Sequence, residues 1–202
     1  SKKMNIIWHG HSCFEITGKD GTIVFDPYQA NSVPGLNSLK LKANLVLCSH
    51  EHDDHNARNC VEVAPKDFKV TCIETYHDHH QGSHRGKNTI HIVDFEDMKV
   101  VHMGDIGCMM DDVSKLKNCD ILMIPIGGYY TIDTKEALEY IERIKPRIVI
   151  PMHYHSHEFG YDVLSTNEEF IQQSSSVTYV DDCLEVNKDT KTQTVVFKQP
   201  RT

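Results

Sequence analysis

Histidine and aspartate side chains crowd into one short stretch of the sequence, in the pattern H-x-H-x-D-H: His50, His52, Asp54 and His55. In an extended segment, residues i and i+2 point to the same side, so the first three can converge on one point while His55 serves a neighbouring point. Neutral imidazole and carboxylate are ligands that suit zinc, manganese or iron. The spacing therefore predicts ligands for two adjacent cations; the alternative is a solvated loop with fortuitous histidines.

Three more candidate ligands each follow an apolar segment further along the chain. Catalytic zinc usually has three protein ligands and an open position, so the first cation needs a third ligand. His77 is the preferred choice because it comes soonest after the apolar segment 70–73. Asp105 follows a glycine at the end of another apolar segment, where a carboxylate can bridge two cations or simply begin a turn. His153 is the first of three histidines after the segment 148–150.

The elements that must position these residues read as short strands first, and then as strands alternating with helices. The first three predicted strands are expected to form an antiparallel meander, and the fourth to be buried on both faces. The segments 89–93 and 98–102 are expected to pair as a hairpin. The predicted strands are 4–8, 12–16, 22–26, 45–48, 70–73, 89–93, 98–102, 121–124, 148–150, 177–180, 184–186 and 194–197.

Capping patterns predict the helices. Asp133 with Glu136 fits a capping box, and the helix that this box opens is expected to stop at Pro146. Similar Ser/Thr-x-x-Glu spacings in 165–169 predict a second helix running toward residue 173. A third helix is expected over residues 57–64.

Composition bounds the class of protein. With 202 residues the chain can bury a core without disulfides, and we expect residues 1–202 to form a single domain. The formal net charge of −8 argues against a general nucleic-acid surface, which depends on Lys and Arg. The seven cysteines are odd in number and contain no C-x-x-C pair, which indicates reduced thiols and a cytoplasmic location. No apolar run is long enough to span a bilayer, so no membrane partner is expected.

The order of motifs resembles the metallo-β-lactamase superfamily nearly from end to end. It runs from N-terminal strands through Phe25-Asp26-Pro27 and H-x-H-x-D-H to a later His, a Gly-Asp pair and a final Met-His. More narrowly, the segments 8–14, 84–89, 101–107 and 124–131 resemble the branch of L-ascorbate-6-phosphate lactonase and related small metal-dependent hydrolases. The resemblance implies an α/β fold, an αββα four-layer sandwich of two mixed sheets with helices outside and the site at one sheet edge.

The resemblance also implies roles for individual residues. It implies two divalent cations in a dinuclear centre, most simply zinc, with manganese or iron as alternatives. The implied ligands are His50, His52 and His77 for the first cation, Asp54, His55 and His153 for the second, and Asp105 as the bridge. Asp26 is expected to orient the ligand loop, and the branch resemblance puts His11 close to the site.

Three departures narrow the expected function. The chain lacks the large inserted domain of the RNA-processing nucleases of the superfamily. His52 stands where the oxygen-reducing di-iron branch has Glu, and no cysteine replaces Asp105. These features favour hydrolysis over redox chemistry and argue against an antibiotic-hydrolysing lactamase.

The resulting hypothesis is a metal-dependent hydrolase in which a metal-bound hydroxide attacks a small, anionic ester, lactone or phosphoester. Asp54 is expected to be catalytic, because it can orient the nucleophile or receive its proton. The candidate substrate-binding residues are Arg85, Asn88, Tyr130 and His155. The expected partner is thus a small molecule. The alternatives are a nuclease or nucleotide phosphodiesterase of the same fold, a non-catalytic metal-binding protein, and a di-iron oxidoreductase.

Overall fold

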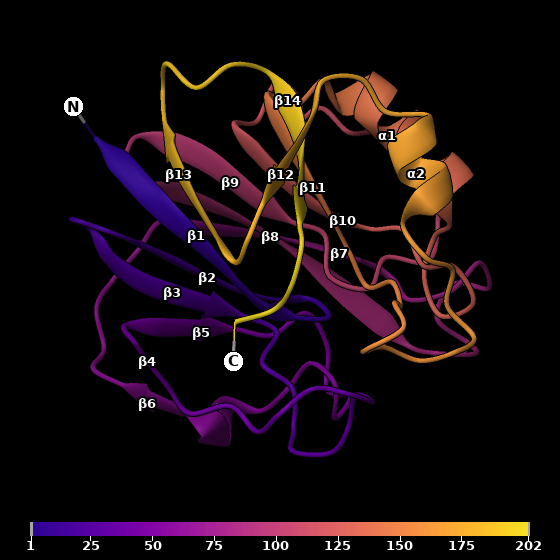
Figure 1. Ribbon diagram of the computed structural model, residues 1–202, viewed down its shortest axis with the longest axis horizontal. Coiled ribbons are helices and arrows are strands. Elements are labelled where there is room, and N and C mark those ends of the chain that lie inside the picture. The colour runs from indigo at the N-terminus through magenta and orange to yellow at the C-terminus, as the bar shows by residue number, and fades with distance from the viewer. Residues whose placement is uncertain (1, 202) are drawn as a thin grey trace.

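Two mixed β-sheets stack face to face in the computed structural model, which describes residues 2–201. Figure 1 shows the smaller sheet, built largely from the N-terminal strands, at the left and lower left, both helices at the upper right, and the larger sheet between them. The predicted α/β sandwich of two mixed sheets is confirmed.

The smaller sheet has five strands in the order β13-β1-β2-β3-β5. Its strands are β1 (Lys3–Gly10), β2 (Cys13–Gly18), β3 (Gly21–Phe25), β5 (Leu45–Leu47) and β13 (Cys183–Asn187). Strands β1 to β3 form the predicted antiparallel meander, and β5 pairs in parallel with β3. The prediction that β5 is buried on both faces is wrong, because β5 is an edge strand whose three residues are only half-buried.

The larger sheet has seven strands in the order β12-β14-β11-β10-β9-β8-β7. Its strands are β7 (Val70–Tyr76), β8 (Lys87–Phe95), β9 (Met98–His102), β10 (Ile121–Pro125), β11 (Ile148–Met152), β12 (Val177–Val180) and β14 (Gln193–Phe197). The predicted hairpin of β8 and β9 is confirmed. In the run β9-β10-β11-β14-β12, each adjacent pair of strands is parallel. Because β7 is antiparallel to β8, it runs parallel to β9.

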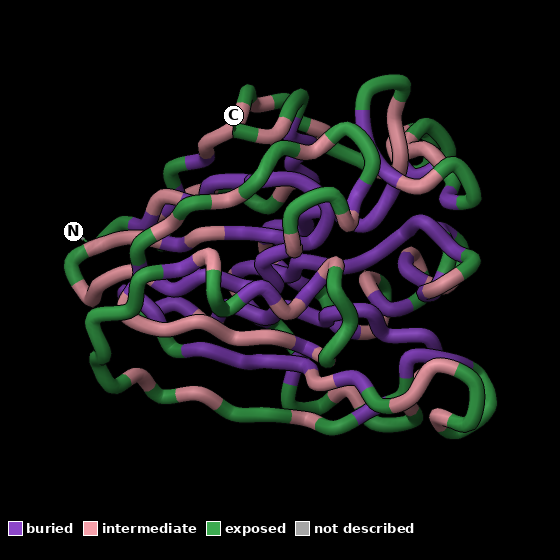
Figure 2. Tube along the Cα trace, turned by 90° about the horizontal axis from the view of Figure 1, so that it is seen from below, coloured by how far each residue is buried: buried purple, intermediate pink, exposed green. Residues whose placement is uncertain are grey.

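Large apolar side chains fill the space between the two sheets. Trp8, Phe14 and Phe25 of the smaller sheet belong to the same buried cluster as Phe95 and Met98 of the larger one. Each fully buried side chain of this kind contributes about 1.5–3 kcal/mol to stability. Figure 2 shows buried residues running through the middle of the molecule, with exposed residues at the outer turns. The strand ends at the sheet edges therefore extend from a closely packed, rigid core.

Helices α1 (Thr134–Ile144) and α2 (Glu168–Gln172) cover the outer face of the seven-stranded sheet (Figure 1). The predicted capping box is present: Glu136 N donates to Asp133 Oδ1 at 3.0 Å, and Asp133 N donates to Glu136 Oε1 at 3.2 Å. Helix α1 ends at Lys145, directly before Pro146.

The outer face of the five-stranded sheet is covered without an α-helix. The helix predicted over residues 57–64 is wrong, because only one 3₁₀ turn forms, η1 (Arg58–Cys60), before β6 (Val61–Val63) pairs with β4 (Leu41–Ala43). Two valines in this short segment favour a strand. A small apolar cluster then joins this cover to the sheet through Cys13, Val24, Tyr28, Val33, Ala43 and Val61.

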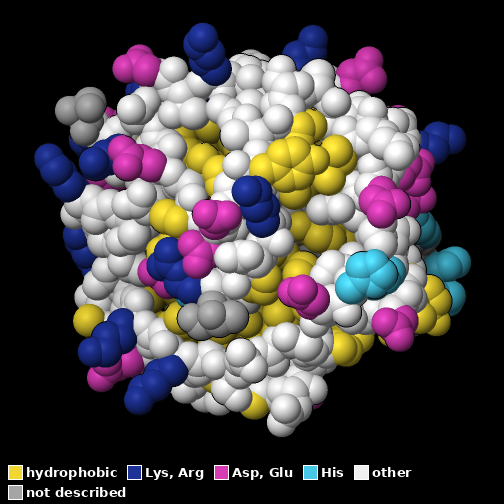
Figure 3. Space-filling view, in the orientation of Figure 1, with side chains coloured by type: hydrophobic (Ala, Val, Ile, Leu, Met, Phe, Trp, Pro, Cys, Tyr) yellow, Lys and Arg dark blue, Asp and Glu magenta, His cyan; other side chains and the backbone are white. Residues whose placement is uncertain are grey.

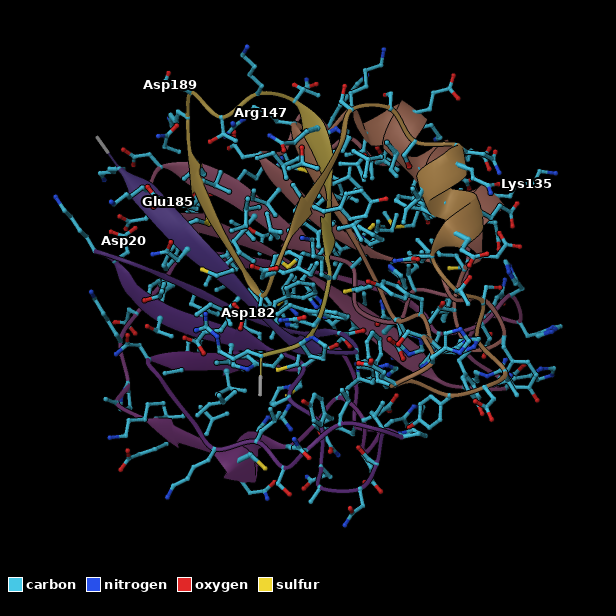
Figure 4. All side chains as sticks on the ribbon, viewed as in Figure 1. Asp20, Lys135, Arg147, Asp182, Glu185 and Asp189 are labelled. Atoms are coloured by element: carbon cyan, nitrogen blue, oxygen red, sulfur yellow. The ribbon has the colours of Figure 1, made fainter. Side chains whose placement is uncertain are left out.

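The surface carries charges of both signs. Figure 3 shows Lys and Arg interspersed with Asp and Glu on the face seen in Figure 1. Lys135, for example, projects from the outer side of the helical layer (Figure 4). Between residues 2 and 201, no helix has the length and apolar character that crossing a membrane requires. All seven cysteines are free.

His91 of β8 supplies a pH-dependent contribution to stability that is separate from any metal. It lies opposite His102 in the sheet and is 5% exposed. Burial, and then His102, lower the pKa of His91 to about 4. The unfolded chain therefore binds a proton that the folded chain excludes, so the free energy of unfolding falls as pH drops from about 6.5 toward 4.

We expect His91→Leu to flatten this part of the stability profile of chelator-treated protein, by an amount on the order of a few kcal/mol between the two pH limits. The measurement is urea denaturation at a series of pH values. His157→Leu, at an exposed position, serves as the control and should keep the wild-type slope. A wild-type slope in His91→Leu would contradict the assignment.

Candidate metal centre

Strand ends from both sheets bring the predicted ligands together. His77, Asp105 and His153 follow β7, β9 and β11, which run in the same direction and end at the same edge of the larger sheet. The H-x-H-x-D-H loop follows β5 of the smaller sheet. All seven predicted ligand residues lie around one centre.

The Asp105 carboxylate is the midpoint of the cluster. Its Oδ2 atom lies 2.9 Å from His55 Nε2, 3.1 Å from His77 Nε2, 3.2 Å from His153 Nε2 and 3.4 Å from His50 Nε2. One carboxylate oxygen thus faces four imidazole nitrogens, as expected for a ligand shared between two ions.

Two groups of donor atoms lie around Asp105, and a third group, made of Asp26, His50 and His55, overlaps both. The nitrogens of His50, His52 and His77 lie within 4.8 Å of one another. The donor atoms of His11, Asp54, His55 and His153 form a second such group. In the second group, Asp54 Oδ2 is 2.8 Å from His11 Nε2, 3.1 Å from His55 Nε2 and 3.9 Å from His153 Nε2. The His11 separation is that of a hydrogen bond to Asp54. The separations of His55 and His153 from Asp54 lie within the limit of about 4.2 Å that zinc–nitrogen and zinc–oxygen bonds of about 2.1 Å set between two donors.

Unsatisfied buried atoms show that the residues fit metal ions. Within the described residues, His50 Nε2, His55 Nε2, His153 Nε2 and Asp105 Oδ1 are buried without a hydrogen-bond partner. The three nitrogens lie near Asp105 but are not aligned as hydrogen-bond donors. Buried polar atoms are rarely left unpaired, and such a group usually indicates an ion or an ordered water.

The electrostatics of the cluster suit metal binding. Burial lowers the pKa of His50 to about 3 and that of His11 to about 4, so both imidazoles are neutral. Burial opposes ionisation of Asp105, yet the histidines around it hold its pKa well below the usual range. His55 has a raised pKa, because Asp105 and Asp54 outweigh the effect of its burial. A cation at this place would therefore displace a proton as it bound.

Asp26 forms hydrogen bonds to the H-x-H-x-D-H loop and to Ser49 directly before it. Its Oδ1 accepts from Ser49 N at 2.7 Å, and its Oδ2 accepts from Ser49 Oγ at 2.6 Å and from His55 Nδ1 at 2.8 Å. With its proton on Nδ1, His55 turns the lone pair of Nε2 toward the centre. Ser49 Oγ also accepts from His50 Nδ1 at 2.8 Å, which orients His50 in the same way. Ser49 was not predicted as a site residue, because its position in the sequence follows no recognisable ligand spacing.

His11 lies closer to the centre than the sequence indicated. Its Nε2 contacts Asp54 as described above, and its ring lies 4.0 Å from that of His153. The backbone of His11 has a φ of 54°, and its carbonyl accepts from Trp8 Nε1 at 3.1 Å. A left-handed conformation outside glycine is costly, and such residues cluster at functional sites.

Two predicted substrate-binding residues lie elsewhere. Asn88 is fully buried; its Oδ1 accepts from Asp105 N at 2.8 Å, and its Nδ2 donates to Thr75 Oγ1 and to Met103 O. It therefore holds the Asp105 turn and has no free donor for a substrate. His155 bonds through Nδ1 to the Leu164 carbonyl and lines a different cavity.

A cavity of about 290 Å³ opens over the cluster. It is lined by His52, Asp54, His77, Arg85, Asp105, Tyr130 and Tyr161. Arg85 and Tyr130 thus lie where the sequence analysis expected substrate contacts. Tyr161 was missed, since it comes from a loop with no regular spacing.

Comparison with known proteins identifies the family. A family model described as beta-lactamase superfamily domain matches residues 5–153. The chain belongs to the metallo-β-lactamase superfamily.

Relatives with curated names are similar over most of their length. A UPF0173 metal-dependent hydrolase of Thermoplasma acidophilum is 30% identical, covering 83% of this chain and 89% of that protein. Another from Natranaerobius thermophilus is 30% identical over 76% of this chain and 84% of that protein. A solved structure from Thermotoga maritima, named for a Zn-dependent hydrolase of the superfamily, has a TM-score of 0.77 and 28% identity, covering 96% of this chain and 98% of that one. The prediction of a metal-dependent hydrolase of this superfamily is confirmed at this level.

Proposed function

We propose that the protein hydrolyses a small, anionic ester, lactone or phosphoester with a dinuclear metal centre. The observation that carries the proposal is the position of Asp105 Oδ2, within 3.4 Å of four imidazole nitrogens at the base of a cavity. The cavity also contains an arginine, which suits an anionic substrate.

We assign one donor group to each of the two proposed ions. His50, His52 and His77 would hold one cation, Asp54, His55 and His153 the other, and Asp105 would bind both. Zinc is the first choice for such a set of nitrogen and oxygen donors, with manganese and iron as alternatives. His11 would position Asp54 by donating to its Oδ2.

Two cations held in this way would lower the pKa of a shared water and polarise an oxygen of the scissile bond. Asp54 lines the cavity, and its side chain is 16% exposed, so it can orient the attacking water and receive a proton. His11 fixes the direction of that carboxylate. Arg85 binds the anionic end of the substrate.

The free state of all seven cysteines supports a reducing compartment, and we place the protein in the cytoplasm on that basis. The net charge of −8 and the mixed charges seen in Figure 3 favour a small-molecule substrate over RNA or DNA.

Metal analysis followed by a substrate screen tests the proposal. Protein purified without chelator should hold about two divalent ions per chain. Among lactones, phosphodiesters and thioesters, at least one class should be hydrolysed, and a chelator should stop the reaction until metal is restored. Full loading without hydrolysis would favour a metal-binding protein instead. Salt-dependent RNA binding would favour a nuclease, and oxygen consumption an oxidoreductase.

A further inference from the structure

Among residues 2–201, only three side chains that line the cavity over the metal cluster lie outside the proposed metal centre: Arg85, Tyr130 and Tyr161. They decide which molecules fit beside the reacting bond. We propose that the substrate is a small ester or lactone with a flat apolar body, such as an aryl group, and one carboxylate, which Arg85 binds. This inference rests on the hydrolase function proposed above.

A rigid loop presents Arg85 to the cavity. The carboxylate of Asp78 accepts four backbone N–H groups, from His80 at 2.7 Å, Gly82 at 2.9 Å, His84 at 3.0 Å and Arg85 at 2.7 Å. These hydrogen bonds order the backbone of the turn that leads to Arg85. The backbone that carries the Arg85 side chain is therefore ordered before a substrate arrives, which favours binding.

The Arg85 guanidinium has no carboxylate partner within residues 2–201. Its central carbon lies 5.4 Å from the ring centroid of Tyr130 and 5.8 Å from that of Tyr129. Aromatic faces hold a cation in place but leave its N–H groups free. Two of these N–H groups match the two oxygens of a carboxylate. One guanidinium balances one carboxylate, whereas a phosphate monoester carries close to two charges at neutral pH.

Tyr130, which lies beside Arg85, and Tyr161 give the cavity aromatic walls that offer few hydrogen bonds. The rings of Tyr130 and Tyr161 lie 6.0 Å apart at an angle of 70°, and Tyr161 also packs against the ring of His11. The hydroxyl of Tyr161 donates to the Ser32 carbonyl, so its proton is not available to a substrate. A flat apolar group packs well on such walls. A polyhydroxylated substrate would leave several hydroxyls without partners, which a buried site disfavours.

The volume of about 290 Å³ is at the lower limit of ordinary ligand pockets, about 300–1,000 Å³, so the substrate must be small. The reaction is a simple hydrolysis. Water gives its hydroxyl to the acyl carbon, the bond from that carbon to the leaving oxygen breaks, and the leaving oxygen takes up the remaining proton.

Two esters with the same acetyl group test the substrate class on metal-loaded protein. We expect kcat/KM for 3-carboxyphenyl acetate to exceed that for phenyl acetate by about tenfold or more, and both to exceed that for 6-phosphogluconolactone. Arg85→Met should abolish the preference for the carboxylate by raising KM, with little change in kcat. Tyr161→Leu should raise KM for both aryl esters, while Tyr161→Phe keeps the ring and the wild-type KM.

Arg143→Met is a matched control. The Arg143 guanidinium lies 6.0 Å from the ring of Tyr140 on helix α1, outside the cavity, so this variant should keep the wild-type preference. A preference for 6-phosphogluconolactone, or an unchanged carboxylate preference in Arg85→Met, would overturn the inference.

Calorimetry separates this inference from the proposed function, because it needs no turnover. Benzoate should bind metal-loaded protein about tenfold more tightly than acetate, and Arg85→Met should lose most of that binding. If no ester is hydrolysed but benzoate binds in this way, the proposed hydrolysis fails and the ligand class stands. If benzoate binds no better than acetate, the ligand class is wrong whatever the protein hydrolyses.

Discussion

Replacing Asp105 with alanine should remove the metal and the activity together. This carboxylate lies between the two donor groups, and each proposed ion depends on it. Loss of a contact that only orients a ligand typically costs 10–100-fold, so loss of a shared ligand should cost about a thousandfold or more in kcat/KM. Elemental analysis and the rate of hydrolysis, measured on the same samples, check this expectation.

The control for Asp105 is Asp94→Ala in the same sheet. Asp94 lies on β8, is exposed and pairs only with Lys69 at 3.4 Å. Surface pairs of this kind contribute about 0–1 kcal/mol, so Asp94→Ala should retain metal and rate. A fully loaded and fully active Asp105→Ala would remove the basis of the dinuclear proposal.

Asp26→Ala should produce the largest loss of stability among these changes. Asp26 is completely buried and accepts three hydrogen bonds, two from Ser49 and one from His55. Burial disfavours its charge, yet His102 and His55 lower the pKa of Asp26 to about 2. Removing one partner from such a buried network costs about 3–5 kcal/mol. Urea denaturation of metal-free protein measures the loss.

A second variant separates charge from backbone strain at this position. Asp26 has a φ of 46°, which asparagine tolerates better than alanine. Asp26→Asn should therefore lose less stability than Asp26→Ala. It should still weaken metal binding, because a neutral amide accepts the His55 Nδ1–H hydrogen bond less strongly than the Asp26 carboxylate does. Asp181→Ala, at an exposed site, should leave both properties unchanged. A stable Asp26→Ala with normal metal affinity would contradict the role of Asp26.

The sequence was informative where local patterns carry a direct physical meaning. The alternation of apolar segments and turns located the strands of the two stacked sheets but not β4 and β6, and the capping box at Asp133 located the start of α1. The ligand candidates followed from the spacing in the H-x-H-x-D-H segment and from a His or Asp soon after an apolar segment, and the family resemblance implied their division between two ions. These patterns need no knowledge of loop conformation, and the structure brings all seven of these residues together.

The remaining features depend on contacts that a single sequence does not record. An apolar run looks the same in a central strand and at an edge, so the exposure of β5 was not foreseen. The segment at 57–64 becomes partly a strand because β4 is available to pair with it. Asn88 and His155 stand beside site residues in the chain, but their side chains form bonds to other partners. Tyr161 reaches the cavity only through the course of its loop.

The proposed ligands are contributed by both halves of the sandwich. The ligands of the H-x-H-x-D-H loop extend from the five-stranded sheet, while His77, Asp105 and His153 extend from the seven-stranded sheet. An ion bound by ligands from both sheets would link the two sheets at the edge where the site lies. Such an ion binds only when the two sheets are packed on each other in the native arrangement. Its binding free energy therefore adds to the stability of that packing. Substitutions deep between the sheets, far from any ligand, can therefore tune metal affinity by shifting one half against the other.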